Sequence, residues 1–303
     1  MDWEDEEHNR QPGREGDEQS HATDGTPTTY ERRKEIVSVS CMSARPRRSC
    51  LAVPASDLRK LEKAATLPAD EIVVDLEDGV ARADKEQARD NLSRAKARGT
   101  LAVRVNKGSI EDIVAASAVA DVIIVPKVES PDDVQAVILH SELPLEVQIE
   151  TTLGLVNVEA IARSPHIEAL LFGPGDFAAS LGVPVLTIGA GASEYALARI
   201  AVAARAFGLQ CIDGPHAALE DGPALRASSE RALSFGYDGK WAIHPSQLDV
   251  LHDVFTPSAE ELERAERILA TDGALRLDGE MVDEATKRMA EAVIARAAPP
   301  SAS

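Results

Sequence analysis

The sequence predicts an α/β protein in which eight parallel strands close into a barrel surrounded by helices, a (β/α)8 or TIM barrel. Short apolar runs rich in Val, Ile and Leu recur eight times after residue 48, and a longer helix-like stretch follows each of them. The turn after the first run, VPASD (53–57), also lacks the Gly-x-Gly-x-x-Gly pattern that is typical of an open doubly wound sheet. We therefore expect a closed barrel.

The expected strands and helices alternate along the chain. The strands are residues 49–53, 71–75, 101–105, 121–125, 145–149, 168–172, 209–213 and 239–243. Helical patterns occupy residues 56–66, 84–98, 109–119, 130–139, 153–163, 193–207 and 221–235. Four of these patterns follow a residue whose side chain suits an N-cap, namely Ser56, Asp84, Ser109 and Ser130.

The two ends of the chain differ from this repeating pattern. Residues 1–46 are acidic and rich in Gly, Pro, Ser and Thr, which predicts a disordered tail because they cannot bury enough apolar surface to offset the entropy of ordering. The barrel is expected to span residues 47–256. Residues 257–303 form a C-terminal helical extension with helices at 258–270 and 282–297 and a Gly- and Asp-rich loop at 271–283. These helices are expected to pack outside the barrel or on a neighbouring subunit.

Composition excludes several classes of protein. The formal net charge is −19, so binding to nucleic acid or to an anionic membrane is not expected. No apolar run is long enough to span a membrane, and the N-terminus lacks a secretory signal pattern, so we expect a cytoplasmic protein. Three cysteines are too few for a disulfide framework, and Cys50 and Cys211 are expected to be small core residues.

Polar residues recur where the expected strands end. In a barrel of this class the active site lies at the C-terminal ends of the strands, so these residues are expected to meet at one rim. They are Asp75, Glu77 and Asp78 after the second strand, Arg104 and Asn106 after the third, Lys127 and Glu129 after the fourth, Glu150 and Thr151 after the fifth, Asp176 after the sixth, Asp213 after the seventh and His244 after the eighth.

Glu150 and Asp176 end adjacent strands, and two carboxylates that converge there repel unless a cation or a proton lies between them. Oxygen ligands without a His or Cys cluster favour Mg²⁺, with Mn²⁺ as the alternative. Capping or salt-bridged carboxylates are the competing interpretation. Arg104 either pairs with Glu77 or Asp78 or presents its guanidinium to a substrate carboxylate. A single Lys, such as Lys127, is more often a structural partner.

Several motifs occur in the order found in one known family. SCLAVPAS, VVDLEDGV, VRVN, VPKVES, IETTLGL, FGPGDFAASLG, GKWAIHPSQ and DGEMVD resemble the HpcH/HpaI aldolase and citrate lyase family over about residues 47–290. The sequence is most similar to the branch of stand-alone proteins related to the citrate lyase β-subunit, which act on acyl-CoA esters. The chain departs from the family at Gly175, where a Glu is frequent, and at Leu197, where an Arg is usual.

The resemblance implies a role for each matching residue. It makes Glu150 and Asp176 the ligands of a catalytic Mg²⁺, with Glu150 also beside the substrate. It places Arg104 on the substrate carboxylate or carbonyl, Asp78 with Glu77 beside the metal-bound waters, and Arg48 near the acyl-CoA. The backbone at Gly173 and Gly175 would line the keto-acid carboxylate. Asp283 would reach the active site of a neighbouring subunit, which implies a homo-oligomer, a trimer or a multiple of one.

The function implied by the resemblance is Mg²⁺-dependent cleavage of a 3-hydroxyacyl-CoA, such as malyl-, citramalyl- or hydroxymethylglutaryl-CoA, to a 2-oxo acid or related acid and acetyl-CoA. Three alternatives stay open. The first is a thioesterase of the (3S)-malyl-CoA type, the second is a metal-dependent aldolase that acts on a CoA-free hydroxy-keto acid, and the third is a non-catalytic subunit that needs partner chains.

Overall fold

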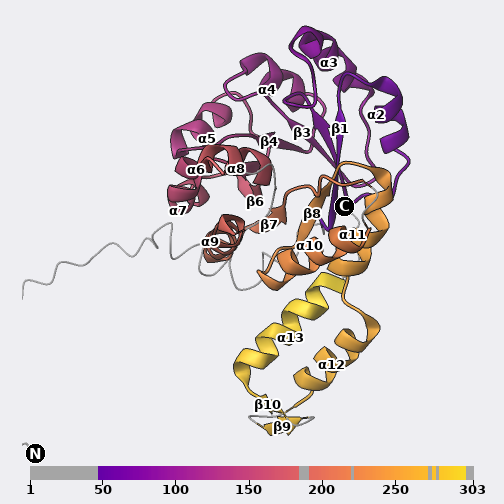
Figure 1. Cartoon of the computed structure of the whole chain (residues 1–303), viewed down its shortest axis with the longest axis vertical. Helices are drawn as coiled ribbons and strands as arrows, with labels where there is room; N and C mark the ends of the chain where they lie inside the picture. Colours follow the sequence, from indigo (N-terminus) through magenta and orange to yellow (C-terminus); the bar gives the residue numbers. More distant parts are fainter. Residues whose placement is uncertain (1–46, 184–190, 220–221, 272–274, 278–279, 298–303) are drawn as a thin grey trace, which may run out of the picture.

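The barrel expected from the sequence is confirmed by a computed structural model that describes residues 47–183, 191–219, 222–271, 275–277 and 280–297 (Figure 1). Eight parallel strands close in sequential order from β1 to β8. They are β1 (Ser49–Pro54), β2 (Glu71–Asp75), β3 (Thr100–Arg104), β4 (Val122–Val125), β5 (Leu145–Ile149), β6 (Ile167–Phe172), β7 (Gln210–Asp213) and β8 (Gly239–Ala242). The expected tail, residues 1–46, lies outside the described residues.

Helices surround the strands in the intervals where the sequence places them. They are α2 (Leu58–Ala64), α3 (Lys85–Asn91), α4 (Ile110–Ser117), α5 (Pro131–Ile138), α6 (Thr152–Val156), α7 (Val158–Ala162), α8 (Pro174–Leu181), α9 (Ala192–Ala206), α10 (Gly222–Ser234) and α11 (Leu248–Phe255), with short 3₁₀ turns at Arg82–Asp84, Leu92–Arg94 and Pro245–Gln247. The single helix expected at 153–163 is interrupted at Asn157, and α8 and α11 were not expected. Pro174 is the first residue of α8, a position where its missing N–H costs nothing.

Two of the four expected N-caps differ in detail. Asp57 rather than Ser56 caps α2, because its carboxylate accepts a hydrogen bond from a first-turn amide. Asp84 precedes α3 but makes no capping bond, since a 3₁₀ turn already leads into this helix. Ser109 and Ser130 cap α4 and α5 as expected.

Successive side chains of β5 point alternately toward the outer helices and toward the inside of the barrel. Val147 and Ile149 belong to the apolar layer between the strands and the outer helices. Glu146, Gln148 and Glu150 have the opposite phase, so they face the inside of the barrel. This pattern brings Glu150 to the C-terminal rim of the strands. Cys50 and Cys211 are completely buried, which confirms that both are core residues.

The C-terminal extension projects from the barrel as an antiparallel helical arm (Figure 1). It contains α12 (Ala259–Leu269), β9 (Leu275–Leu277), β10 (Glu280–Val282) and α13 (Glu284–Ala297). A small apolar cluster of its own holds the two helices together and includes Ile268, Val282 and Ala290. The expectation of a plain loop at 271–283 is wrong, because β9 and β10 pair as a hairpin. Within the described residues, no helix is both long and apolar enough to cross a bilayer.

Candidate active site

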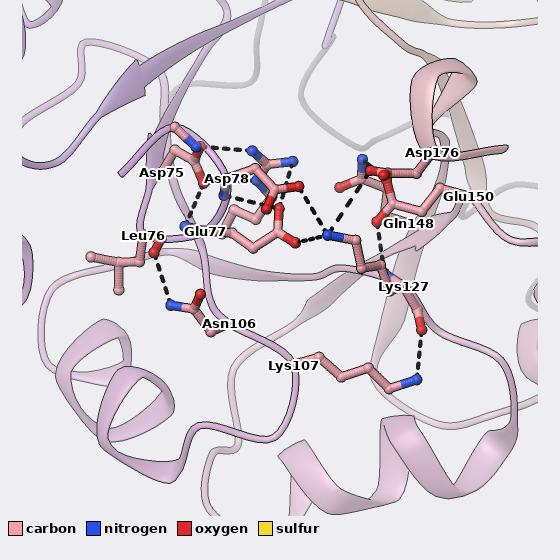
Figure 2. A network of polar contacts seen from close by, with 12 residues as sticks. Asp75, Leu76, Glu77, Asp78, Asn106, Lys107, Lys127, Gln148, Glu150 and Asp176 are labelled. Atoms are coloured by element: carbon pink, nitrogen blue, oxygen red, sulfur yellow. Dashed lines mark hydrogen bonds and ion pairs between the residues drawn. The ribbon is translucent and has the colours of Figure 1, made fainter. Parts of the chain in front are cut away.

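Charged side chains from several strand ends converge at the C-terminal rim of the barrel (Figure 2). The structure brings together five residues that the sequence predicts, Glu77, Asp78, Arg104, Glu150 and Asp176. They come from the ends of β2, β3, β5 and β6, as the strand-end argument requires. The contacts among them decide what the cluster can do.

Arg104 is fixed by a carboxylate to which sequence reasoning gave no role. Its Nε and Nη2 lie 2.8 and 2.7 Å from the two carboxylate oxygens of Asp75, and its Nη1 lies 3.2 Å from Glu77 Oε2. Asp75 also accepts hydrogen bonds from the backbone N–H groups of Glu77 and Gly79. The guanidinium lies 5.2 Å from the centre of the buried Trp241 ring. Burial opposes the cation, but Asp75 and Glu77 outweigh it and raise the pKa of Arg104.

The Lys127 side chain lies between Glu77 and Asp78 on one side and Asp176 on the other. Its ammonium group donates hydrogen bonds to Glu77 and to Asp78, the latter at 2.9 Å, and lies 4.0 Å from Asp176 Oδ2 (Figure 2). Burial disfavours the ammonium, but the two hydrogen bonds outweigh this and raise the pKa of Lys127. Burial also opposes ionisation of Asp78, yet the contact with Lys127 holds the pKa of that carboxyl below its ordinary value. Lys127 is therefore part of the site.

Glu150 is a buried carboxyl with both oxygens in use. Oε1 accepts a hydrogen bond from the backbone N–H of Lys127 at 2.8 Å, and Oε2 accepts one from Gln148 Nε2 at 2.7 Å. Burial, followed by repulsion from the nearby Asp176 carboxylate, raises the pKa of Glu150 to about 8. Gly173 makes room for this side chain, because a Cβ at that position would lie 2.4 Å from Glu150 Oε2.

The donor set fits a hard divalent cation. Glu150 and Asp176 offer carboxylate oxygens, and the Oε1 of Gln148 is buried beside them without a hydrogen-bond partner. The site holds five carboxyl groups, with Asp75, Glu77 and Asp78, against the two cations Arg104 and Lys127. No group of three or more His, Cys, Asp or Glu side chains among the described residues could hold a metal ion. Water and substrate would therefore supply the remaining ligands, as in an open catalytic site.

Three predicted residues lie outside this cluster within one chain. Arg48 precedes β1 and is therefore at the opposite end of the barrel, where its Nε lies 2.8 Å from Asp70 Oδ2. The interpretation of Arg48 as a residue beside the acyl-CoA does not agree with this position. Asp283 lies on the C-terminal arm and accepts the hydrogen bond of the Thr286 N–H at the start of α13. The Nδ1 of His244 forms a hydrogen bond with the hydroxyl of Ser246, two residues further along the chain.

Sequence reasoning missed residues that shape the loop after β2. The Lys85 ammonium donates hydrogen bonds to the backbone carbonyls of Leu76 and Glu77 at 2.6 and 2.5 Å and to Asn106 Oδ1 at 2.9 Å. These bonds fix the segment that carries Glu77 and Asp78. The sequence indicates only the Asn106 side of these contacts, because Asn106 follows the third strand and is therefore expected at the rim of the barrel. Lys85 is in a helical pattern, and nothing in the sequence points to this contact.

Comparisons with known proteins show which family this chain resembles. The family model of the HpcH/HpaI aldolase/citrate lyase family matches residues 48–245. A (3S)-malyl-CoA thioesterase of Cereibacter sphaeroides is 39% identical over 259 residues, which cover 79% of this chain and 90% of that protein. An L-malyl-CoA/beta-methylmalyl-CoA lyase of the same species is 34% identical, with 84% and 95% covered.

A solved structure shares the fold over most of the chain. It is CitE from Mycobacterium tuberculosis in complex with magnesium, acetoacetate and coenzyme A, which is 31% identical and superposes with a TM-score of 0.74. The match covers 84% of this chain and 99% of that one. The barrel, the acidic cluster at its rim and these similarities lead to one conclusion: the chain belongs to the HpcH/HpaI aldolase/citrate lyase family.

Proposed function

We propose that the protein is a Mg²⁺-dependent carbon–carbon lyase that splits a 3-hydroxyacyl-CoA, such as malyl-CoA or citramalyl-CoA, into a 2-oxo acid and acetyl-CoA. The observation that carries the proposal is the pairing of buried Glu150 with Asp176 at the open rim of the barrel, beside the fixed cation Arg104. Relatives named as malyl-CoA lyases and the magnesium complex of CitE support it.

In this proposal some residues of the site bind the metal ion and the substrate, and others stabilise the negative charge that forms during the reaction. Glu150 and Asp176 would hold the Mg²⁺, with Mn²⁺ as the alternative, and the bound ion would lower the pKa of the substrate hydroxyl as a Lewis acid. Arg104, oriented by Asp75, would stabilise the negative charge of the 2-oxo acid. The backbone at the start of α8, at its N-cap Gly173 and at Gly175 in its first turn, would face the carboxylate of that acid.

Cleavage needs a proton acceptor and a proton donor. Asp78 suits the first role because its side chain is 62% exposed at the rim and its carboxyl is ionised. After it takes the hydroxyl proton, the carbon–carbon bond breaks and its electron pair goes to the α-carbon of the thioester, which gives an enolate. We propose that Asp283 of a second copy passes a proton from water to this enolate, so the active enzyme is a homo-oligomer, a trimer or a multiple of one.

Thioester hydrolysis is the second candidate function, and the relative named (3S)-malyl-CoA thioesterase favours it. In that reaction water attacks the thioester carbonyl, the carbon–sulfur bond breaks, and free CoA and the hydroxy acid are released. The same residues would bind the substrate, so the products rather than the site distinguish the two reactions.

The test is product analysis with the purified full chain. Malyl-CoA, citramalyl-CoA, hydroxymethylglutaryl-CoA and CoA-free hydroxy-keto acids are each incubated with Mg²⁺ or with EDTA, and the products are separated by liquid chromatography. Acetyl-CoA with a keto acid, formed only with Mg²⁺, is the expected result, whereas free CoA with an intact hydroxy acid would identify a thioesterase. Turnover of CoA-free hydroxy-keto acids alone, or no turnover of any substrate, would contradict the proposal.

A further inference from the structure

Lys127 has a backbone conformation that is rare for a residue with a side chain. Its φ is 52°, in the left-handed region, so the surroundings must hold it there. Its N–H donates to Glu150 Oε1 at 2.8 Å, and its carbonyl accepts a hydrogen bond from the Lys107 ammonium at 2.7 Å (Figure 2). The backbone N–H and carbonyl of Lys127 are thereby both held by hydrogen bonds, and in this conformation the side chain points into the acidic cluster.

The Lys127 ammonium neutralises the carboxylates that would attract a divalent cation. It bonds to Glu77 and Asp78 and lies 4.0 Å from Asp176, one of the two proposed metal ligands. The other cation of the cluster, Arg104, is paired with Asp75 and Glu77 on the side of β2. Lys127 is thus the cation that stands between the acidic pair and Asp176.

We propose that Lys127 is an internal counter-ion that limits the affinity of the site for its divalent cation. The inference rests on the proposed function, because it takes Glu150 and Asp176 as the metal ligands. Positive charges that share the same carboxylates repel each other, and at separations of about 5 Å in a partly hydrated site this repulsion changes a binding constant on the order of tenfold. Removal of the ammonium therefore strengthens metal binding, whereas loss of a merely structural contact would weaken it.

The experiment is calorimetric titration of the full chain with MgCl₂ alone, without substrate. Lys127→Met keeps the length of the side chain and the same backbone demand but removes the charge, and it is expected to bind Mg²⁺ about tenfold more tightly. Lys127→Arg keeps the charge and is expected to bind as the wild type does. Lys60→Met is the matched control, because Lys60 is an exposed lysine on α2 whose charge lies 3.6 Å from Asp57.

Each outcome decides the inference. Affinity of Lys127→Met equal to or weaker than that of the wild type would overturn it, as would equal strengthening in Lys60→Met. If Lys127→Met does not fold by circular dichroism, Lys127→Asn replaces it, because Asn is neutral and tolerates the left-handed conformation. A wild type that binds no Mg²⁺ would contradict the proposed function and the inference together, whereas wild-type binding with an unchanged Met variant contradicts the inference alone.

Discussion

Arg104 and Asp75 form a two-point ion pair at the edge of the site, with Nε and Nη2 of the guanidinium 2.8 and 2.7 Å from the two carboxylate oxygens. A planar guanidinium held at two points can take only one orientation. This pairing leaves Nη1 on the side of Glu77, toward the acidic cluster. Asp75 is thus the residue that aims Arg104, and both side chains are almost completely buried.

Asp75→Asn should destabilise the protein because it removes the two-point partner of the buried Arg104 cation and leaves only the contact with Glu77. Removal of one member of a buried pair typically costs about 3–5 kcal/mol, and the amide isostere should give a loss near the lower value. Urea unfolding measures this loss. Glu62→Gln is the control, since Glu62 pairs with Arg94 at the surface and should change stability by less than about 1 kcal/mol. Equal effects of the two substitutions would contradict the role of Asp75.

Arg104→Lys should retain the positive charge but lose the planar fork. A lysine cannot pair with both oxygens of Asp75 and face the substrate in the same geometry. We expect kcat/KM for the CoA ester to fall on the order of 100-fold, while the protein stays folded. Steady-state kinetics with the CoA ester that product analysis selects measure the change, and a kcat/KM within a factor of two of the wild type would show that the guanidinium geometry is not used.

Gly173→Ala should disturb Glu150 directly. The added Cβ would lie 2.4 Å from both Glu150 Cβ and Glu150 Oε2, so the carboxyl must move out of its position. We expect Mg²⁺ binding to weaken by at least about tenfold, a change that corresponds to 1.4 kcal/mol. Gly222→Ala at the start of α10 is the control, because its Cβ meets no atom within 4 Å. Unchanged Mg²⁺ binding in Gly173→Ala would show that the position of Glu150 is not critical.

A second carboxyl inside the barrel predicts a pH effect on stability. Glu146 is completely buried on β5, and burial followed by repulsion from Glu71 raises its pKa well above the ordinary value of 4.5, although Arg47 opposes this. The folded protein therefore retains a proton that the unfolded chain loses above about pH 4.5, so this carboxyl lowers stability as the pH rises. In Glu146→Gln the carboxyl is replaced by a neutral amide, which does not ionise as the pH rises.

The stability of Glu146→Gln relative to the wild type should therefore increase from pH 5 to pH 8. Urea unfolding at the two pH values, in EDTA, measures the two differences. A Glu146→Gln effect that does not change with pH would contradict the raised pKa of this carboxyl. Glu146 also lies 2.9 Å from the Nε of Arg47, which keeps its contacts with Glu71 and Glu168 in the variant.

The strands were predictable because each is buried and therefore reads as a short apolar run. All eight lie within one or two residues of their expected limits. The strand-end rule also placed Glu150 and Asp176 together, since it needs only the order of the strands. The same rule argues against Arg48 as a residue of the active site, because Arg48 lies before the start of β1 and the site lies at the other end of the strands.

The contacts of the site were less predictable because they join loops that are distant in sequence. Lys127 and Glu77 are 50 residues apart, and only the closed barrel brings them into contact. Asp75 and Asp78 stand in the same motif, and nothing in the sequence shows which of them takes Arg104. The proposed role of Asp283 in the site of a second copy involves a contact between chains, and the order of strands within one chain does not predict such a contact.

The most direct test of the metal site is an anomalous difference map from crystals of the full chain grown with Mn²⁺. We predict one peak bonded to carboxylate oxygens of both Glu150 and Asp176, at about the 2.1 Å expected of such ligands. Absence of a peak at this rim, or a peak bound to other residues, would contradict the proposal that these two carboxylates hold the catalytic ion.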